Sequence, residues 1–184
     1  MEKAGLKRYE VFVTSVLRTM PPMGDASLWV AQKSSEVSEQ HVVCGDKYVH
    51  PQVALGVGEL MAEIKALQPN IVIASGNLAS WACTGNWSSF TFRGSLEEVK
   101  GVTHLDGSPI KCIATYSHKL VSQQTERVPV VQQDLRRAKA ESQYPELIRP
   151  NYEFIISPDY RQTMSVLAQI SEQLSKAELY LGAD

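Results

Sequence analysis

The sequence predicts an α/β fold, specifically a three-layer α/β/α sandwich with a central, mostly parallel sheet of about four strands. Short apolar runs alternate with stretches of helical periodicity along the 184 residues. One run, at 71–74, is apolar throughout, which is typical of a parallel strand buried on both faces. Ligands of such sheets bind beyond the carboxyl ends of the strands. The loops after Val16, Ser75 and Tyr116 are therefore the expected functional loops.

The first part of the chain holds one predicted strand, one long connection and one helix. Residues 9–16 are rich in valine and aromatic side chains, which favours a strand. Residues 22–51 are polar and serine-rich, with a short helix indicated only at 34–40, so we expect an irregular excursion at the surface. Apolar residues then recur at helical spacing over 60–67, and Pro69 ends this helix before the apolar run.

The rest of the chain continues the alternation of helices and strands. The expected elements are a helix over 78–84, a strand over 110–116, a helix over 129–141, a strand over 154–156 and a helix over 158–176. Gly85 ends the first of these helices, because glycine adopts the left-handed cap conformation at little cost. The last helix is amphipathic, with Met164, Leu167, Ile170 and Leu174 on one stripe.

Length and composition favour one principal domain, because a chain of this size buries about 70% of the surface that its unfolded form exposes. We expect residues 1–150 to form the α/β domain. Residues 151–184, a strand and an amphipathic helix, are expected to pack on it or to lead into a following domain. No apolar run approaches the ~20 residues that cross a membrane. The mixed-charge N-terminus does not look like a secretory signal, so we expect a cytoplasmic location.

Charge and cysteine usage exclude several classes of function. A formal net charge of -2 argues against tight, indiscriminate binding of nucleic acid, so any DNA contact must come from a local patch. Three cysteines without a CxxC pair indicate reduced thiols. His41, Cys44 and His50 match no familiar zinc-site spacing. The GVG stretch at 56–58 has no strand before it, unlike a dinucleotide-binding loop. We therefore expect no metal and no cofactor.

A series of short motifs follows a characteristic order and spacing over residues 4–140. The motifs are VTSVLRTMPP at 13–22, EL at 59–60, PNIVIASG at 69–76, RG at 93–94, TY at 115–116 and DL at 134–135. This series resembles the uracil-DNA glycosylase superfamily, particularly its iron–sulfur branch. The resemblance implies a glycosylase-like fold over most of the chain.

The resemblance also implies what this chain lacks. In the family, an asparagine reads the edge of uracil, and its position corresponds to Ser15. The family's His-Pro-Ser loop, whose histidine stabilises the departing base, corresponds to the SHK stretch at 117–119, so the histidine is displaced by one position. Cluster-binding cysteines of the family correspond to Thr19 and Gly56, so the iron–sulfur cluster is not expected. The family's opening strand and its Gly-Pro-Gly-like loop, which carries the water-activating group, have no counterpart here.

We therefore predict a non-catalytic glycosylase-fold module that acts in DNA binding or scaffolding during replication or repair. Cleavage of a glycosidic bond needs an activated water or a stabilised oxocarbenium ion on one side and stabilisation of the leaving base on the other. Neither half is intact, so no catalytic residue is assigned, and His118 is the single candidate. The residues expected to contact DNA are Ser15, Ser117, His118, Lys119, Leu120 and Arg127.

Two alternatives predict different behaviour. An active DNA glycosylase would remove uracil or another damaged base, using His118 and an unrecognised acid. A protein-binding accessory domain would dock its partner on the segment 22–51. For Lys119 and Arg127 an ordinary solvated surface is the competing interpretation, and for Leu120 it is core packing.

A second, shorter resemblance lies near the C-terminus. Residues 177–184 are similar to the opening strand of a proofreading exonuclease domain, in which an apolar run leads to the first metal-binding aspartate. Some phage DNA polymerases of the bacterial type I class carry a glycosylase-like domain ahead of such an exonuclease. The resemblance implies that this chain is such an N-terminal domain. Its expected partners are then DNA and a polymerase or exonuclease domain or other replication proteins, in the cytoplasm of a bacterial or phage-infected cell.

Overall fold

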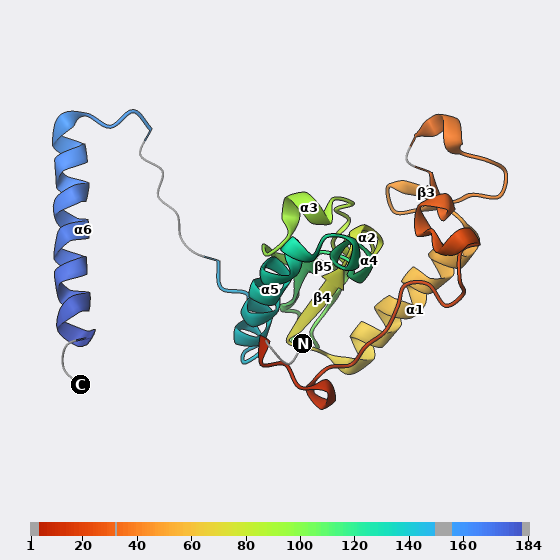
Figure 1. Cartoon of the computed structure of the whole chain (residues 1–184), viewed down its shortest axis with the longest axis horizontal. Coiled ribbons are helices and arrows are strands. Elements are labelled where there is room, and N and C mark those ends of the chain that lie inside the picture. The colour runs from red at the N-terminus through yellow and green to blue at the C-terminus, as the bar shows by residue number, and fades with distance from the viewer. Residues whose placement is uncertain (1–3, 32, 150–155, 182–184) are drawn as a thin grey trace. The chain divides into compact units, whose positions relative to one another are not determined.

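The computed structural model describes residues 4–31, 33–149 and 156–181 of the chain (Figure 1). The chain divides into two compact units, Met1–Leu147 and Ile148–Asp184. The described part of the first unit contains two three-stranded sheets, one antiparallel and one mixed, together with helices α1 to α5. The protein is thus a mixed α/β protein. The prediction of a single central, mostly parallel sheet of about four strands is therefore wrong.

The mixed sheet has the strand order β4-β6-β5. Strand β4 (Ile71–Ser75) runs parallel to β6 (Pro109–Thr115), with Ser75 opposite Thr115. These two strands confirm the predictions at 71–74 and 110–116. Strand β5 (Leu96–Thr103) pairs antiparallel with β6. A short connection between neighbouring strands requires antiparallel pairing, so this unpredicted strand makes the sheet mixed.

Helices cover both faces of the mixed sheet. Helices α1 (Pro51–Leu67) and α2 (Asn77–Thr84) lie on one face and share a hydrophobic core with Cys112 of β6. Helix α5 (Val128–Glu141) lies on the other face. There the fully buried side chain of Lys111 donates from Nζ to the carbonyl of the last residue of α5 at 2.6 Å. Successive residues of a strand point to opposite faces of the sheet. Lys111 and Cys112, which are neighbours on β6, therefore contact helices on different faces.

The helices predicted within this unit are present, with different bounds. Helix α1 begins well before the predicted residue 60, whereas α2 and α5 lie within one residue of their predicted bounds. The short helix expected within 34–40 is present as the 3-10 helix η5 (Ser34–Glu36). Other elements too short to show periodicity were not predicted: α3 (Ser89–Phe92), α4 (His118–Gln123), and the 3-10 helices η2 (Arg8–Glu10), η3 (Pro22–Gly24), η4 (Ala26–Trp29) and η6 (Thr125–Arg127).

The segment 22–51 is more ordered than the sequence predicts. It contains a three-stranded antiparallel sheet with the strand order β1-β3-β2. Val30 and Val49 from this small sheet are buried together with Val53 of α1 and Trp81 of α2. The strands are β1 (Val30–Ala31), β2 (Val42–Cys44) and β3 (Lys47–Val49). The prediction of an irregular excursion is therefore wrong, because strands this short show no alternation in the sequence.

Residues 9–16 do not form the predicted strand. Within the described chain the stretch from Val11 to Met20 is extended and pairs with no strand. It packs on helix α1 instead, where the carbonyl of Val16 lies against Gly56. Arg18 forms ion pairs with two glutamates of α1 at 2.8 and 2.6 Å. Contact with a helix therefore replaces the sheet pairing that the composition favours.

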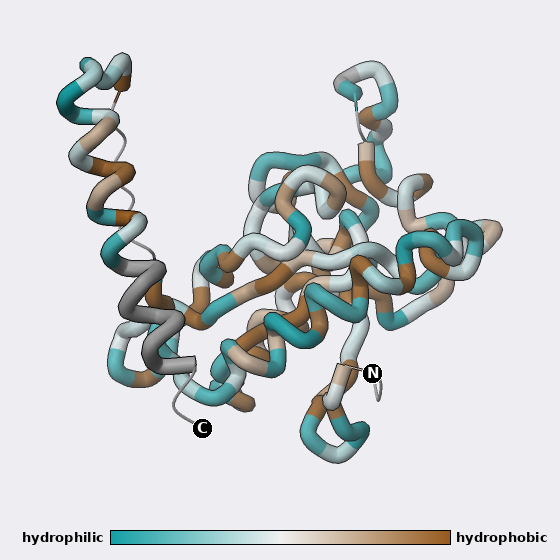
Figure 2. Tube along the Cα trace, turned by 60° about the vertical axis from the view of Figure 1, so that its left-hand side comes forward, coloured by the Kyte–Doolittle hydropathy of each residue, from teal (hydrophilic) through white to brown (hydrophobic). Residues whose placement is uncertain are grey.

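The second unit contains helix α6 (Tyr160–Leu181). This helix confirms the prediction over 158–176 in type. Figure 2 shows hydrophobic and hydrophilic residues alternating along the coloured, N-terminal part of this helix, as the spacing of Met164, Leu167 and Ile170 predicts. Among the described residues, neither α6 nor any other helix is long and apolar enough to cross a membrane.

Two strand predictions concern this second unit. The strand at 154–156 falls mostly outside the described residues, and Ile156, which is described, is in neither a helix nor a strand. Helix α6 continues to Leu181, so residues 177–181, which resemble the opening strand of an exonuclease domain, are helical here. The remaining residues of that resemblance lie outside the described part of the chain.

Candidate functional site

The carboxyl ends of β4 and β6 meet at one edge of the mixed sheet, which we refer to as the carboxyl edge. The Ser75 hydroxyl donates to the carbonyl of Tyr116 at 3.1 Å, and the Gly76 N–H donates to the carbonyl of Thr115 at 2.9 Å. Gly76 has a φ of +87°, and a Cβ there would lie 2.8 Å from Cβ of Ser117. The loops after the two strands are therefore packed tightly enough to require glycine.

Four of the predicted contact residues begin helix α4 at this edge. Ser117 is the N-cap, and its Oγ accepts the backbone N–H of Leu120 at 3.3 Å. His118 and Lys119 are exposed, whereas Leu120 is half-buried. The imidazole and the ammonium are therefore the groups of this loop that a ligand can reach most easily.

Lys119 has an acidic neighbour. Hydrogen bonds from the hydroxyl and the backbone N–H of Ser27 lower the pKa of Asp25, and the positive charge of Lys119 lowers it further. The Asp25 carboxylate also caps helix η4. It offsets part of the positive charge that Lys119 brings to the carboxyl edge.

A cation and two aromatic rings lie together beside the same loop. The guanidinium of Arg127 is 4.7 Å from the ring centre of Tyr116 and 5.7 Å from that of Phe90. The two ring centres are 6.2 Å apart, with 37° between the ring planes. Tyr116 is buried, whereas Phe90 is 65% exposed. These distances are typical of cation–π contacts, and we refer to Phe90, Tyr116 and Arg127 as the stacking cluster.

A second arginine at this edge is held by a carboxylate. Nη1 of Arg93 donates to Oδ1 of Asp134 at 3.1 Å, and the Thr115 hydroxyl donates to Oδ2 of Asp134 at 2.8 Å. Asp134 comes from α5 and is buried. A buried carboxylate needs such partners, because it has lost its hydration. Arg93 therefore stabilises the edge, and its charge is largely offset.

Ser15 lies apart from the other predicted contact residues. It belongs to the extended segment that packs on α1, and its Oγ accepts the N–H of Leu17 at 3.2 Å. In the part of the chain that the structure describes, no hydrogen bond, ion pair or ring contact joins Ser15 to the carboxyl edge. The structure thus brings together Ser117, His118, Lys119, Leu120 and Arg127 and leaves Ser15 on a different element.

The residues at the family's cluster-binding positions do not fit an iron–sulfur cluster. Such clusters need thiolate ligands, as a rule. Thr19 offers only a hydroxyl, and a Cβ at Gly56 would overlap the carbonyl oxygen of Val16. His50, one of the side chains considered as metal ligands, caps α1 and stacks on Trp29 at 4.8 Å. Over the described residues, no group of three or more His, Cys, Asp or Glu side chains could hold a metal ion.

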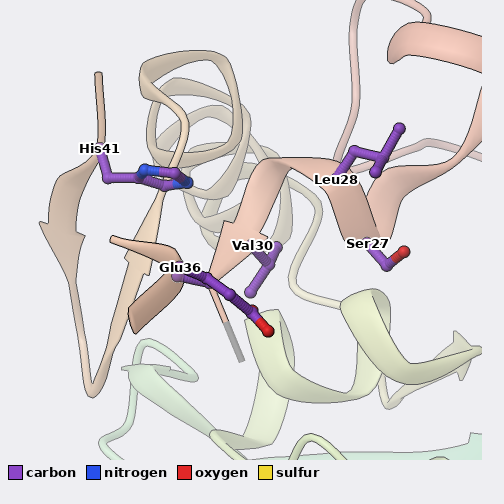
Figure 3. Close-up of a pocket in the computed structure, with 6 residues that line it drawn as sticks. Ser27, Leu28, Val30, Glu36 and His41 are labelled. Carbon is purple, nitrogen blue, oxygen red and sulfur yellow. The ribbon is translucent and has the colours of Figure 1, made fainter. Parts of the chain in front are cut away.

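A cavity of about 190 Å³ lies at the small sheet, lined by Ser27, Leu28, Val30, Ala31, Glu36 and His41 (Figure 3). The imidazole of His41 is held at Nδ1 by the Ser38 hydroxyl at 2.8 Å. Figure 3 shows the carboxylate of Glu36 pointing away from this imidazole. The two ionisable side chains of the cavity do not converge on one point, so the carboxyl edge is the better candidate site.

Sequence reasoning assigned no contact to Tyr116, although it named the loop that follows, and it missed Phe90 entirely. Phe90 lies on the short helix α3, which Ser88 caps by accepting the N–H of Thr91 at 3.2 Å. Ser89 anchors this helix, because its N–H and hydroxyl both donate to Oδ1 of Asn77, at 3.1 and 2.6 Å. A helix of one turn has no periodicity that a sequence could show. The adjacent serines Ser88 and Ser89, which are good cap residues, are the one local signal.

No protein-family model matches the chain, and no curated protein matches it. The fold is a mixed α/β fold whose carboxyl edge presents exposed cationic and aromatic groups. The geometry of this edge and the motifs in the sequence are therefore the features that indicate a function.

Proposed function

We propose that this chain is a non-catalytic, uracil-DNA glycosylase-like module that binds DNA at its carboxyl edge during replication or repair. The observation that supports it best is the gathering of Arg127, Lys119 and His118 beside the loops that follow the two parallel strands. Cationic side chains of this kind position proteins on nucleic acid through its phosphates. The net charge of -2 is compatible with a local contact of this size.

The fold supports the same proposal in part. Helices on both faces of the mixed sheet agree with the layers of a glycosylase-like fold, although β5 is antiparallel. In this proposal the chain works beside a polymerase or exonuclease domain of a phage-type DNA polymerase. DNA and that replication machinery are its partners.

Base excision is not part of this function, because the polar groups at the edge already have structural partners. The buried carboxylate of Asp134 accepts hydrogen bonds from Arg93 and Thr115, which leaves it poorly suited to activate a water. The oxygen of Ser117 accepts a backbone N–H. His118 is exposed to solvent, whereas stabilisation of a departing base is strongest where water is excluded.

The first test measures retention of the protein on immobilised DNA at low and rising salt. We expect retention that falls with salt and that is weakened by Lys119→Glu and by Arg127→Glu, because each removes a phosphate contact. Lys65→Glu is the matched control. It makes the same charge change on the exposed surface near the C-terminus of α1, close to the amino end of β4 and away from the carboxyl edge.

A second assay separates the proposal from its two alternatives. The protein is incubated with uracil-containing single-stranded and duplex DNA, and abasic sites are counted. We expect none that depend on the protein. Abasic sites that disappear with His118→Ala would instead establish an active glycosylase. A protein that is not retained on DNA even at low salt would contradict DNA binding and favour a protein-binding accessory domain.

A further inference from the structure

We infer that the carboxyl edge takes single-stranded rather than duplex DNA, with an unpaired base stacked on the ring of Phe90. This inference rests on the proposed function and names the form of DNA and the side chain that meets the base. It follows from three observations: the exposure of Phe90, the fixed position of its helix, and the charge of the arginine beside it.

Phe90 exposes a large apolar ring at a fixed position. Phe90 is 65% exposed, although aromatic residues gain much from burial. The helix that carries it is held by both Ser89 hydrogen bonds to Asn77 and by the Ser88 cap. The ring is also supported from within the protein by Tyr116, at 6.2 Å between centres. A supported but open ring loses little freedom when a planar group stacks on it.

Arg127 supplies a positive charge that no described carboxylate pairs with. None of the described carboxylates forms a salt bridge with it, whereas Arg93 at the same edge is paired with Asp134. Its guanidinium lies over the rings of both Tyr116 and Phe90. The N–H donors of a guanidinium lie in its own plane, so a guanidinium that contacts aromatic faces can still donate to a phosphate.

An aromatic face next to a cation that no described carboxylate pairs with suits a nucleotide whose base is not stacked on its neighbours. In a duplex the base faces are covered and only the base edges are open in the grooves. In a single strand the faces are open, and every base can stack on an aromatic side chain regardless of its identity. The stacking cluster therefore favours single strands without strong sequence preference.

The test measures fluorescence anisotropy of three labelled probes with the full chain. The probes are an oligothymidylate of about 15 nucleotides, an abasic oligomer of the same length and backbone charge, and a duplex of the same sequence. We expect the oligothymidylate to bind at least about fivefold more tightly than the abasic oligomer, which is the lower limit for one stacked base. The duplex should bind no more tightly than the abasic oligomer.

Phe90→Leu should remove the preference for the oligothymidylate and leave binding of the abasic oligomer unchanged. Phe12→Leu is the matched control, because Phe12 is 62% exposed on a different segment. Arg127→Gln should weaken binding of both single strands. Circular dichroism of each variant checks that it is folded.

The outcomes separate the two proposals. Equal affinity for all three probes, or an oligothymidylate affinity that Phe90→Leu leaves unchanged, would overturn the stacking inference while DNA binding itself stands. Loss of the preference in Phe12→Leu as well would also overturn it. Failure to bind any probe at low salt would overturn both proposals.

Discussion

Substituting alanine for Gly56 tests whether the extended N-terminal segment is anchored on α1. A Cβ at this position would overlap the carbonyl oxygen of Val16 and lie 3.0 Å from its carbonyl carbon. The obstacle is backbone, which cannot rotate away as a flexible side chain does. The segment must therefore leave the helix, or the helix must shift.

The magnitude follows from what the displaced segment loses. Val16 is buried in the main core, and exposing a valine costs about 1.5–3 kcal/mol. The ion pairs of Arg18 with Glu59 and Glu63 are lost with it, but they are exposed and weak. Alanine offsets about 1 kcal/mol of this through its higher helix propensity. We expect Gly56→Ala to lower the free energy of unfolding by about 0.5–2 kcal/mol.

Gly58→Ala is the matched control on the same helix, because nothing lies within 4 Å of a Cβ at that position. It should raise stability by up to about 1 kcal/mol through helix propensity alone. Urea unfolding followed by circular dichroism should separate the midpoints of the two variants by about 1 M. Trypsin should also cleave after Arg18 faster in Gly56→Ala. Equal midpoints, or a Gly56→Ala protein more stable than the wild type, would refute the reasoning.

Two further predictions concern side-chain hydrogen bonds. Asp134→Asn leaves the Arg93 cation without its carboxylate, so we expect the free energy of unfolding in urea to fall by about 1–3 kcal/mol. Gln133→Ala, at an exposed position, is the control. A loss for Asp134→Asn as small as that of the control would contradict the prediction. The hydrogen bond from Nε1 of Trp81 lowers the pKa of Asp46 below its usual 3.8. Its stabilisation is complete above that pH and is lost as the pH falls through the folded-state pKa. Asp46→Asn should therefore lower the free energy of unfolding more at pH 7 than at about pH 3. An equal loss at both pH values would exclude the effect.

Strands with continuous apolar sequence and the longer helices could be predicted from the sequence. Strands at the edge of a sheet, and segments whose structure depends on what they contact, could not. Strands β4 and β6 are apolar over most of their length, so the pattern indicates them directly. Strand β5 carries Glu97, Glu98 and Lys100 and includes a glycine, which hides it. Residues 9–16 have the composition of a strand, yet Phe12 and Val13 are exposed and the segment lies on a helix. Composition indicates an extended backbone there but not its partner.

The candidate site was predictable only where its residues share a loop. Ser117 to Leu120 are adjacent in sequence, so placing one after β6 placed them all. The contact between Phe90 and Arg127 depends on two short helices, α3 and η6. Neither helix is long enough to show a hydrophobic periodicity in the sequence. The segments that connect strands and helices often carry functional side chains, and one-turn helices within them show no period that pattern analysis can detect.

The two arginines of the carboxyl edge show why residue type alone does not assign a role. Both lie over the ring of Tyr116, at 5.6 Å for Arg93 and 4.7 Å for Arg127. Arg93 faces a carboxylate that is buried and that would be costly to leave unpaired, so removing Arg93 is expected to act on folding. Arg127 has no such partner among the described residues, so removing it is expected to act on ligand affinity. The difference comes from one aspartate on α5, whose position becomes known only when the helix is placed against the sheet.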